Sequence, residues 1–432
     1  MKHKLKQKQN QRITRITEST LVVGADIAKK VHVARAVDFR GIELGKDCVF
    51  HNDQEGLTKL SEWMKELGRM QEKTDIVFGI EPTGHYWFPL AAFLEEQGIQ
   101  VVVVNPHHVN KSKELEDNSQ TKSDYKDAKV IADLVRNGKY SVPNLPTKEY
   151  AELRILMNLR GKITVNLNQV KARITGWTDR YFPEYPTVFK DWTGKASRMT
   201  LRQFPTPEEI LAEGARGALT HWKTEIKQGI GIKRAERLYV AAMSSIGLTE
   251  GLAAARIELA ALLEQYDLYV KQEETIMTSV MQILEKIPGT EHMLSVPGVG
   301  VLTVAGFLAE VGDLNNYDHG QQIIRLAGLN LTENSSGKRK GKTGISKRGR
   351  SRLRALLFRV MLPMVARNAE FKALHKYYTT RSQNPLKKKQ SMIALCGKLI
   401  RVFYTLGTTQ KMYNARDVIG PVRQAQLDQH AA

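Results

Sequence analysis

The sequence contains only two cysteines, Cys48 and Cys396, and they lie far apart in a chain of 432 residues. Neither a disulfide framework nor a zinc knuckle is therefore indicated, and we expect a reducing compartment. No long apolar run occurs, and no apolar segment follows the basic first residues. These absences exclude a predicted membrane span or secretory signal, so we expect a soluble cytoplasmic protein with no membrane partner.

Acidic residues are scarce relative to basic ones, with 45 Asp and Glu against 65 Lys and Arg, a formal net charge of +20 and a pI near 9.7. Such an excess of cations favours a polyanionic partner, because neutralising phosphates releases counterions. Nucleic acid is the expected partner, although a basic ribosomal or membrane-surface protein would have a similar composition. The length suggests two or three domains, each able to bury a core.

The N-terminal part after a basic, disordered arm (1–19) has the pattern of an α/β domain (20–147). We expect strands at 21–26, 32–37, 42–50, 75–81 and 99–105, and helices at 55–67 and 86–97. The order βββαβαβ followed by a helix is typical of an RNase H-like fold. The continuous apolar run Val101–Val104 predicts a mixed sheet covered by helices on both sides.

The remainder of the chain has a helical pattern. Residues 148–286 are expected to form a coiled-coil arm with an insertion, because Leu153, Leu156 and Ile163 recur at helical spacing. Residues 287–415 form a mainly α-helical C-terminal domain and 416–432 a tail. In Val296-Pro297-Gly298-Val299-Gly300 the turn resembles a helix-hairpin-helix, in which Gly298 and Gly300 would let the backbone bind a phosphate. A short helix connection would use the same residues for geometry alone.

Four acidic residues occupy the places where an RNase H-like topology would bring carboxylates together. Asp26 ends the first strand, Glu81 ends the neighbouring strand, and Asp124 and Asp127 share one face near the start of a helix. Hard divalent cations such as Mg²⁺ bind carboxylate oxygens, so the four predict a metal site. The alternative is structural, with Asp124 as a helix cap and the others solvated.

The densest basic segment lies between residues 338 and 354 and contains no acid. Its cations are Lys338, Arg339, Lys340, Lys342, Lys347, Arg348, Arg350, Arg352 and Arg354. A solvated loop would normally mix charges of both signs, so we expect these residues to contact nucleic acid. Ser336 precedes this segment, and nearby positive charge would favour a serine attacking phosphorus, although serine and glycine are also ordinary loop formers.

Several short motifs together resemble those of the DEDD transposase family of bacterial insertion sequences. The N-terminal motifs are Gly24-Ala25-Asp26-Ile27-Ala28-Lys29, Glu81-Pro82-Thr83-Gly84 and Lys122-Ser123-Asp124-Tyr125-Lys126-Asp127-Ala128. The C-terminal motifs are Val296-Pro297-Gly298-Val299-Gly300, Leu326-Ala327-Gly328-Leu329, and Ser336-Gly337 followed by Ile345-Ser346-Lys347-Arg348-Gly349. The resemblance spans most of the chain.

The resemblance implies a bacterial, nucleoid-associated recombinase with a RuvC-like N-terminal domain, guided by a structured RNA. It implies that Asp26, Glu81, Asp124 and Asp127 bind Mg²⁺ and that Ser336 becomes covalently joined to DNA. Family members often have Gln-Ser-Gly where this chain has Asn334-Ser335-Ser336-Gly337. Ser335 is therefore an alternative candidate for the nucleophile. The segment from about Gly176 to Ile232 is longer than a minimal member needs and is a candidate dimerisation or RNA-contacting arm.

The two chemical centres lie on separate domains, so we expect the acids of one subunit to act with the serine of another, in a dimer or a tetramer. The expected activity is cutting and rejoining of DNA without ATP, since no Walker-type GxxxxGK[ST] sequence is present. One alternative is a metal-dependent nuclease of the junction-resolvase type that forms no covalent intermediate. A second is a non-catalytic nucleic-acid-binding protein.

Overall fold

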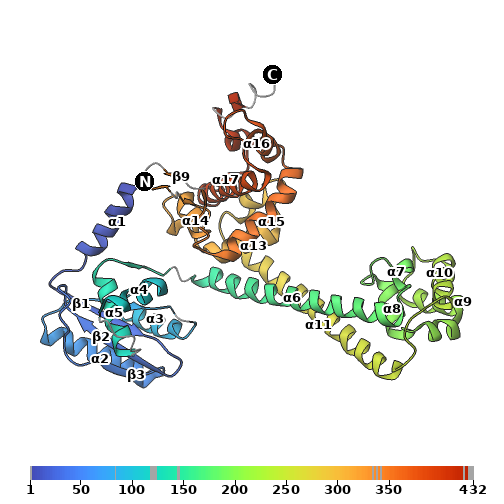
Figure 1. The fold of residues 1–432 in the computed structure, drawn as a ribbon, viewed down its shortest axis with the longest axis horizontal. Coiled ribbons are helices and arrows are strands. Elements are labelled where there is room, and N and C mark those ends of the chain that lie inside the picture. Colours follow the sequence, from blue (N-terminus) through green and yellow to red (C-terminus); the bar gives the residue numbers. More distant parts are fainter. Residues whose placement is uncertain are drawn as a thin grey trace. The chain divides into compact units, whose positions relative to one another are not determined.

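The computed structural model describes residues 2–82, 84–116, 124–143, 146–332, 335–336, 339–340, 343–421 and 424–426. The chain divides into two compact units, 1–144 and 145–432 (Figure 1). The first unit is a mixed α/β structure and the second is mostly helical. Within the described ranges, no helix is both long and apolar enough to cross a membrane.

The first unit contains a six-stranded mixed sheet in the order β3-β2-β1-β4-β5-β6. Its strands are β1 (Thr20–Asp26), β2 (Val31–Val37), β3 (Cys48–His51), β4 (Asp75–Ile80), β5 (Gln100–Val104) and β6 (Tyr140–Ser141). β1, β4 and β5 are parallel, and the other pairings are antiparallel. The predicted mixed sheet is confirmed. The strand expected over 42–50 is limited to β3 and an isolated bridge at Glu43, because Gly45 adopts a positive φ of 65° between them.

The helices of the first unit are α1 (Lys2–Thr14), α2 (Gln54–Met70), α3 (Trp87–Glu96), α4 (Pro106–Glu116) and α5 (Asp124–Arg136). Where the sequence predicted a disordered arm, the structure has the helix α1. Lysine, glutamine and arginine are good helix formers, and this segment has neither glycine nor proline. Its last turn is held because the Arg12 guanidinium donates to the Tyr140 carbonyl and lies over the Tyr140 ring.

The central strand β1 is buried on both sides. Val22 belongs to a core cluster with Ile131 and Val135 of α5, whereas Val23 faces the opposite side and is equally buried. Gly24 faces α5, and a Cβ at this position would overlap the Ala128 carbonyl oxygen and the Ala132 nitrogen. Helix and strand therefore approach each other as closely as their backbones permit.

The second unit is built on two long antiparallel helices, α6 (Lys148–Tyr181) and α11 (Leu252–Lys286), which lie side by side as an arm (Figure 1). A lobe of shorter helices occupies one end of the arm. It comprises α7 (Tyr185–Val188), α8 (Lys195–Gln203), α9 (Pro207–Glu225) and α10 (Ile232–Met243). The predicted long helix is present, but Leu159 is 43% exposed, so not every residue of its apolar pattern is buried.

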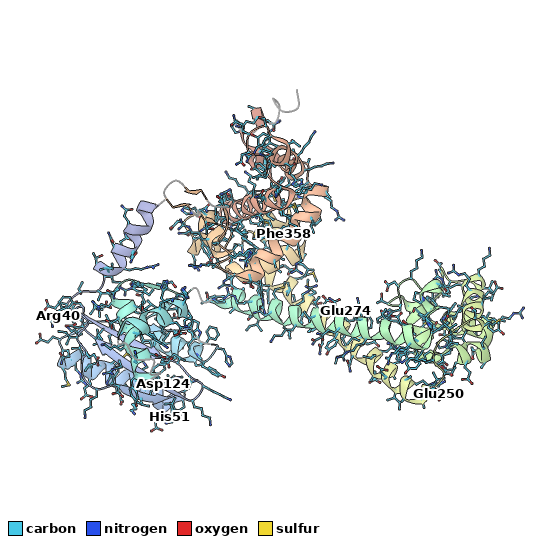
Figure 2. All side chains as sticks on the ribbon, viewed as in Figure 1. Arg40, His51, Asp124, Glu250, Glu274 and Phe358 are labelled. Atoms are coloured by element: carbon cyan, nitrogen blue, oxygen red, sulfur yellow. The ribbon has the colours of Figure 1, made fainter. Side chains whose placement is uncertain are left out.

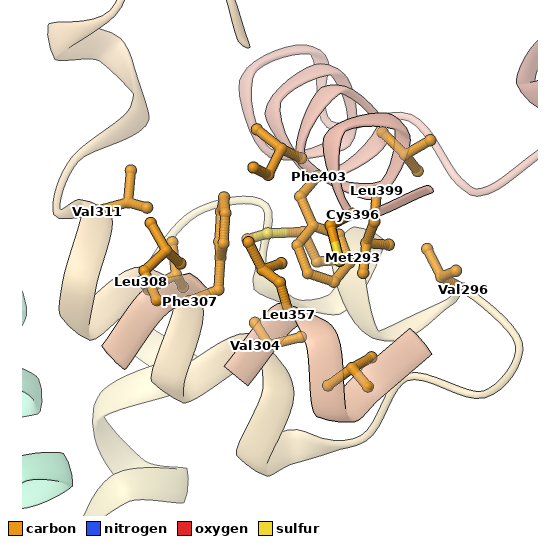
Figure 3. Packing of buried hydrophobic residues seen from close by; sticks show 14 of the residues in the cluster. Met293, Val296, Val304, Phe307, Leu308, Val311, Leu357, Cys396, Leu399 and Phe403 are labelled. Carbon is orange, nitrogen blue, oxygen red and sulfur yellow. The ribbon is translucent and has the colours of Figure 1, made fainter. Parts of the chain in front are cut away.

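The other end of the arm carries the C-terminal helices. They are α12 (Thr290–Leu294), α13 (Val301–Val311), a 3-10 turn (Leu314–Asn316), α14 (Gly320–Leu326), α15 (Ser351–Arg367), α16 (Ala369–Thr380), α17 (Lys388–Thr409) and α18 (Ala415–Ile419). Their core includes Phe307 of α13, Leu357 of α15 and Phe403 of α17, all fully buried (Figure 3). The Phe307 and Phe403 rings meet edge to face at 5.0 Å.

We predict that Gly24→Ala loosens α5 from the sheet, because the added methyl overlaps the backbone of α5. Overpacking of this kind costs about 1–3 kcal/mol. Hydrogen exchange of peptides covering 20–26 and 124–136 measures the effect. Gly68→Ala is the control, since that helical glycine has no neighbour closer than the Lys73 carbonyl oxygen at 3.3 Å. Equal protection in wild type and Gly24→Ala would contradict the close approach.

Candidate active site

Two of the predicted acids lie at one edge of the sheet. Asp26 is the last residue of β1, and Glu81 follows directly after Ile80, the last residue of β4. Ala25 is paired with Ile80 in the parallel register of these strands. Asp26 and Glu81 therefore leave the sheet side by side, and both are half-buried.

The other two acids lie in the first turn of α5, where the helix dipole favours negative charge. Asp127 is 5% exposed, whereas Asp124 is exposed (Figure 2). The packing of α5 on β1 brings both carboxylates near Asp26. Burial raises the pKa of Asp26, and the negative charges of Asp127 and Asp124 raise it further. The structure thus brings three of the four acids into electrostatic contact.

A lysine that the sequence reading missed neutralises part of this charge. Lys113 of α4 donates from Nζ to Oδ2 of Asp127 at 2.5 Å, and it opposes the rise in the pKa of Asp26. The sequence did contain a signal for the start of α4, the helix that carries Lys113. Proline suits the first position of a helix, and Asn105 Oδ1 caps α4 by accepting from the His107 N–H at 2.9 Å.

The acidic group has the donor chemistry that a hard cation needs. Oδ1 of Asp127 is buried and has no hydrogen-bond partner among the described residues, so it is an oxygen available for a ligand. In the described ranges no three His, Cys, Asp or Glu side chains already form a metal-ligating group. The Lys113 ammonium is bonded to the other oxygen, Oδ2, and would compete with a cation for the negative charge of Asp127. The carboxylate oxygens are ligands of the kind that Mg²⁺ prefers.

A buried histidine fixes the segment after Asp26. The Ala28 N–H donates to Nδ1 of His32 at 3.2 Å, and the imidazole packs edge to face on Phe50. His32 is fully buried, and this burial lowers its pKa. The imidazole is consequently neutral at pH 7, which leaves Nδ1 able to accept.

The predicted serine loop belongs to the second unit and is described only in part. β8 (Ser335–Ser336) pairs with β9 (Arg339–Lys340) as an antiparallel ladder, with Ser336 opposite Arg339 and Ser335 opposite Lys340. Asn334, Gly337, Lys338 and Lys342 lie outside the described residues. The described backbone therefore places both candidate serines directly beside cations of the basic segment.

Two glycine motifs hold the base of this loop. β7 (Leu331–Thr332) pairs with β10 (Gly344–Ile345), and the Lys347 N–H donates to the Gly328 carbonyl at 3.0 Å. A Cβ on Gly349 would overlap the Leu326 carbonyl oxygen, so these segments touch backbone to backbone. The backbone contacts between the motifs around Gly328 and Gly349 thus hold together the two chain segments from which the serine hairpin extends.

The described cations of the basic segment have different surroundings. Lys347 and Arg348 are exposed. Arg350 forms an ion pair with Glu310 at 3.5 Å, and Arg354 donates to the Ala327 carbonyl at 2.9 Å. Arg352 is exposed and donates to Asn158 Oδ1. The last three have structural contacts, and Lys347 and Arg348 are the residues most available to a phosphate.

The Pro-Gly-Val-Gly turn connects α12 with α13 as predicted. Gly298 has a φ of 88°, a value that favours glycine, and Gly300 is the N-cap of α13 in an extended conformation. Asn368 donates from Nδ2 to the Pro297 carbonyl at 3.3 Å and ties the turn to α16. No atom would lie within 4 Å of a Cβ on Gly300, so its outer side is open.

Comparison with known proteins finds two family models along the chain. A model described as "Transposase", of the DEDD type, matches residues 23–183, and one described as "Transposase IS116/IS110/IS902 family" matches residues 290–378. The chain is similar to an uncharacterised 44.8 kDa protein of insertion element IS116 from Streptomyces clavuligerus, with 25% identity over 90% of this chain and 95% of that protein. It is also similar to the transposase of insertion sequence IS1111A from Coxiella burnetii, with 22% identity over 91% of each chain. A pilin gene-inverting protein from Moraxella bovis is 21% identical over 92% of this chain and 99% of the relative.

Both models describe enzymes that move DNA segments, and the first spans Asp26, Glu81, Asp124 and Asp127. The protein is therefore a DNA transposase/recombinase, and DNA is its substrate. Since the two models together cover more than half of the chain, it belongs to the IS116/IS110/IS902 family of insertion-sequence transposases.

We predict that Lys113→Met increases the stabilisation of the protein by Mg²⁺, because the ammonium group no longer competes with the metal for the charge of Asp127. Without metal the variant melts at a lower temperature than wild type, since the repulsion between the acids is less compensated. Thermal unfolding with and without MgCl₂ measures both effects.

Lys65→Met, an exposed lysine on α2, is the control for the loss of one charge. Asp127→Asn should abolish most of the Mg²⁺ effect. The assignment fails if Mg²⁺ shifts the melting temperature of Lys113→Met and Asp127→Asn equally.

Proposed function

We propose that this transposase cuts and rejoins DNA with two groups, an Mg²⁺-binding acidic tetrad and a serine nucleophile. The observation that carries the proposal is the convergence of Asp26, Asp124 and Asp127, with one buried Asp127 oxygen lacking a partner among the described residues. The strand order β3-β2-β1-β4-β5 supports an RNase H-like, RuvC-like fold for the first unit, in which Glu81 completes the tetrad.

Mg²⁺ held by Asp26, Glu81, Asp124 and Asp127 would supply positive charge that stabilises a phosphate under attack. In the chain itself, Lys113 balances part of the charge of Asp127, and His32 keeps the segment after Asp26 in place. The close contact of α5 with β1 fixes the spacing of the carboxylates, so that they need little reorganisation.

Ser336 is the proposed nucleophile. Its Oγ forms a bond to phosphorus while one phosphodiester oxygen leaves as a hydroxyl, and the proton of Ser336 passes to solvent or to that oxygen. The protein–DNA ester conserves the phosphodiester energy, so a DNA hydroxyl can reverse the step and join a new strand. The cations near the hairpin, Arg339 and Lys340 on β9 and Lys347 and Arg348 below it, would stabilise the charge that develops on the phosphate.

The proposal also includes selection of the DNA sequence and assembly of an oligomer. A structured guide RNA would select the DNA by base pairing, while the protein contacts backbone and shape. Because the acids and the serine lie in separate units, the active species would be a dimer or tetramer in which different subunits supply the two groups. The relative from Moraxella bovis is a pilin gene-inverting protein, and inversion of a gene supports cleavage coupled to rejoining.

A metal-dependent nuclease is the competing function, and a covalent adduct distinguishes it. We predict that wild-type protein, mixed with its flanking RNA, element-end DNA and Mg²⁺, forms a protein–DNA adduct on a denaturing gel. Ser336→Ala and Asp26→Ala should each lose it, because one lacks the nucleophile and the other the metal ligand.

Ser335→Ala should keep the adduct, and Ser279→Ala on α11, outside the basic segment, serves as a control. Loss in Ser335→Ala alone would transfer the role of nucleophile to Ser335. DNA cleavage without an adduct that persists in Ser336→Ala would establish the nuclease instead.

The exposed pair Lys347 and Arg348 provides a test of the basic segment. The double variant Lys347→Ala, Arg348→Ala should bind DNA more weakly. The slope of log affinity against log salt concentration should become shallower by the equivalent of about one to two phosphate contacts. Fluorescence anisotropy at several salt concentrations measures this slope.

Lys388→Ala with Lys389→Ala removes the same charge from exposed positions on α17. An unchanged slope in the first pair, or the same decrease in both pairs, would remove Lys347 and Arg348 from a specific interface.

A further inference from the structure

The lobe at the end of the arm contains a helical hairpin that none of the family matches covers. The matched ranges end at residue 183 and resume at 290, so α9 and α10 lie between them. The hairpin is anchored by Trp222 of α9, which is fully buried and donates from Nε1 to Thr200 Oγ1 at 2.9 Å. The α9–α10 hairpin is therefore packed firmly onto the rest of the lobe.

The turn of this hairpin has the same backbone as the Pro-Gly-Val-Gly turn of the C-terminal domain. Gly229 has a φ of 80° and Gly298 a φ of 88°. The second glycine is an N-cap in both, with φ and ψ of −140° and 168° at Gly231 and −118° and 171° at Gly300. In each case one apolar residue separates the two glycines.

The packing after the two turns also agrees. Four residues beyond the second glycine, Ala235 and Val304 are both fully buried, and three residues further the same holds for Leu238 and Phe307. Both helices thus bury equivalent positions. Within the described residues, the turn at Gly229 therefore resembles the turn at Gly298, for which the sequence had indicated a helix-hairpin-helix.

The hairpin in the lobe carries six exposed cations, three on each side of the turn. They are Arg216, Lys223, Lys227, Lys233, Arg234 and Arg237. In the part of the chain that the structure describes, none of the six forms an ion pair. On α9 the pair Arg216 and Lys223 lies seven residues apart on one face, opposite the buried Ala218 and Trp222.

Several other cations of the same lobe and arm are paired with acids. Arg180 pairs with Glu258 at 3.1 Å, Lys195 with Glu225 at 3.2 Å and Arg198 with Asp267 at 3.4 Å. The hairpin also carries the exposed acids Glu208, Glu213 and Glu236, but the residues around its turn, 227–237, have four exposed cations and one acid. This local excess of positive charge is costly through self-repulsion and is relieved by a polyanion. The chemistry of the surface is that of a phosphate-backbone contact.

We propose that the α9–α10 hairpin binds the sugar–phosphate backbone of duplex DNA without reading its sequence. Lysine and arginine on a rigid hairpin contact phosphates and position a protein on DNA, whereas sequence is read by groups that reach the base edges. The proposal rests on the charges and packing of the lobe and is independent of the serine mechanism. It assigns to the lobe a DNA-contacting surface of its own.

The test compares two sets of three substitutions in the full chain, each removing three positive charges. Lys227→Gln, Lys233→Gln and Arg234→Gln lie at the hairpin turn, and Lys190→Gln, Lys271→Gln and Lys286→Gln are exposed control positions. The hairpin set should lower the salt dependence of binding to a duplex of unrelated sequence by about three phosphate contacts, and the control set by much less. Equal effects would overturn the proposal.

A second variant tests the contact without changing charge. Gly231→Ala adds a methyl to a position with no atom within 4 Å and with an extended backbone that alanine adopts readily, so the packing should be retained and only the poorer N-cap should lower stability slightly. A duplex close to the turn would be pushed away, and the variant, still folded at the assay temperature, should bind it more weakly. Full binding by both Gly231→Ala and the hairpin set would refute the contact.

The nature of the partner is tested with the same proteins. An RNA duplex of equal length, offered in place of DNA, should distinguish the variants less than DNA does. If the hairpin set loses RNA binding and keeps DNA binding, the hairpin contacts RNA and the proposal is wrong. A changed oligomeric state with unchanged DNA binding would show that the hairpin contacts protein.

Discussion

The candidate site depends on one steric constraint, the contact of α5 with the backbone of β1. Only a residue without a Cβ allows this approach, and Gly24 is that residue, two positions before Asp26 in β1. The helix brings alanines, Ala128 and Ala132, to the same contact, so nothing bulky separates the two elements. This contact also brings the Asp26 and Asp127 carboxylates together. Asp26 lies two residues after Gly24 on β1, and Asp127 directly precedes Ala128 on α5.

The same closeness has an electrostatic cost. Burial raises the pKa of Asp26, and the nearby charges of Asp127 and Asp124 raise it further. Lys113 offsets part of this effect within the chain, and a divalent cation would offset more. A perturbed carboxylate with only partly balanced negative charge is typical of a site that binds a positively charged ligand.

Much of the first unit could be predicted from sequence because its strands are continuous apolar runs that end in acids. The positions of Asp26 and Glu81 followed from the strand order, and those of Asp124 and Asp127 from helical spacing. Lys113 could not be found this way, because α4 has little apolar periodicity and its contact with Asp127 is tertiary. The α9–α10 turn was overlooked although its glycine spacing equals that at Gly298, since its first glycine lacks the preceding proline.

The arm gives the second unit a fixed internal length. α6 has 34 residues, which corresponds to about 50 Å of helix. Along one strand of B-DNA, with about 3.4 Å per nucleotide, that is roughly 15 base pairs. Four residues inserted into or removed from both α6 and α11 would alter the span by about 6 Å and rotate the lobe by about 40° about the arm axis. The separation and the orientation of the lobe are thus both set by the number of residues in two paired helices.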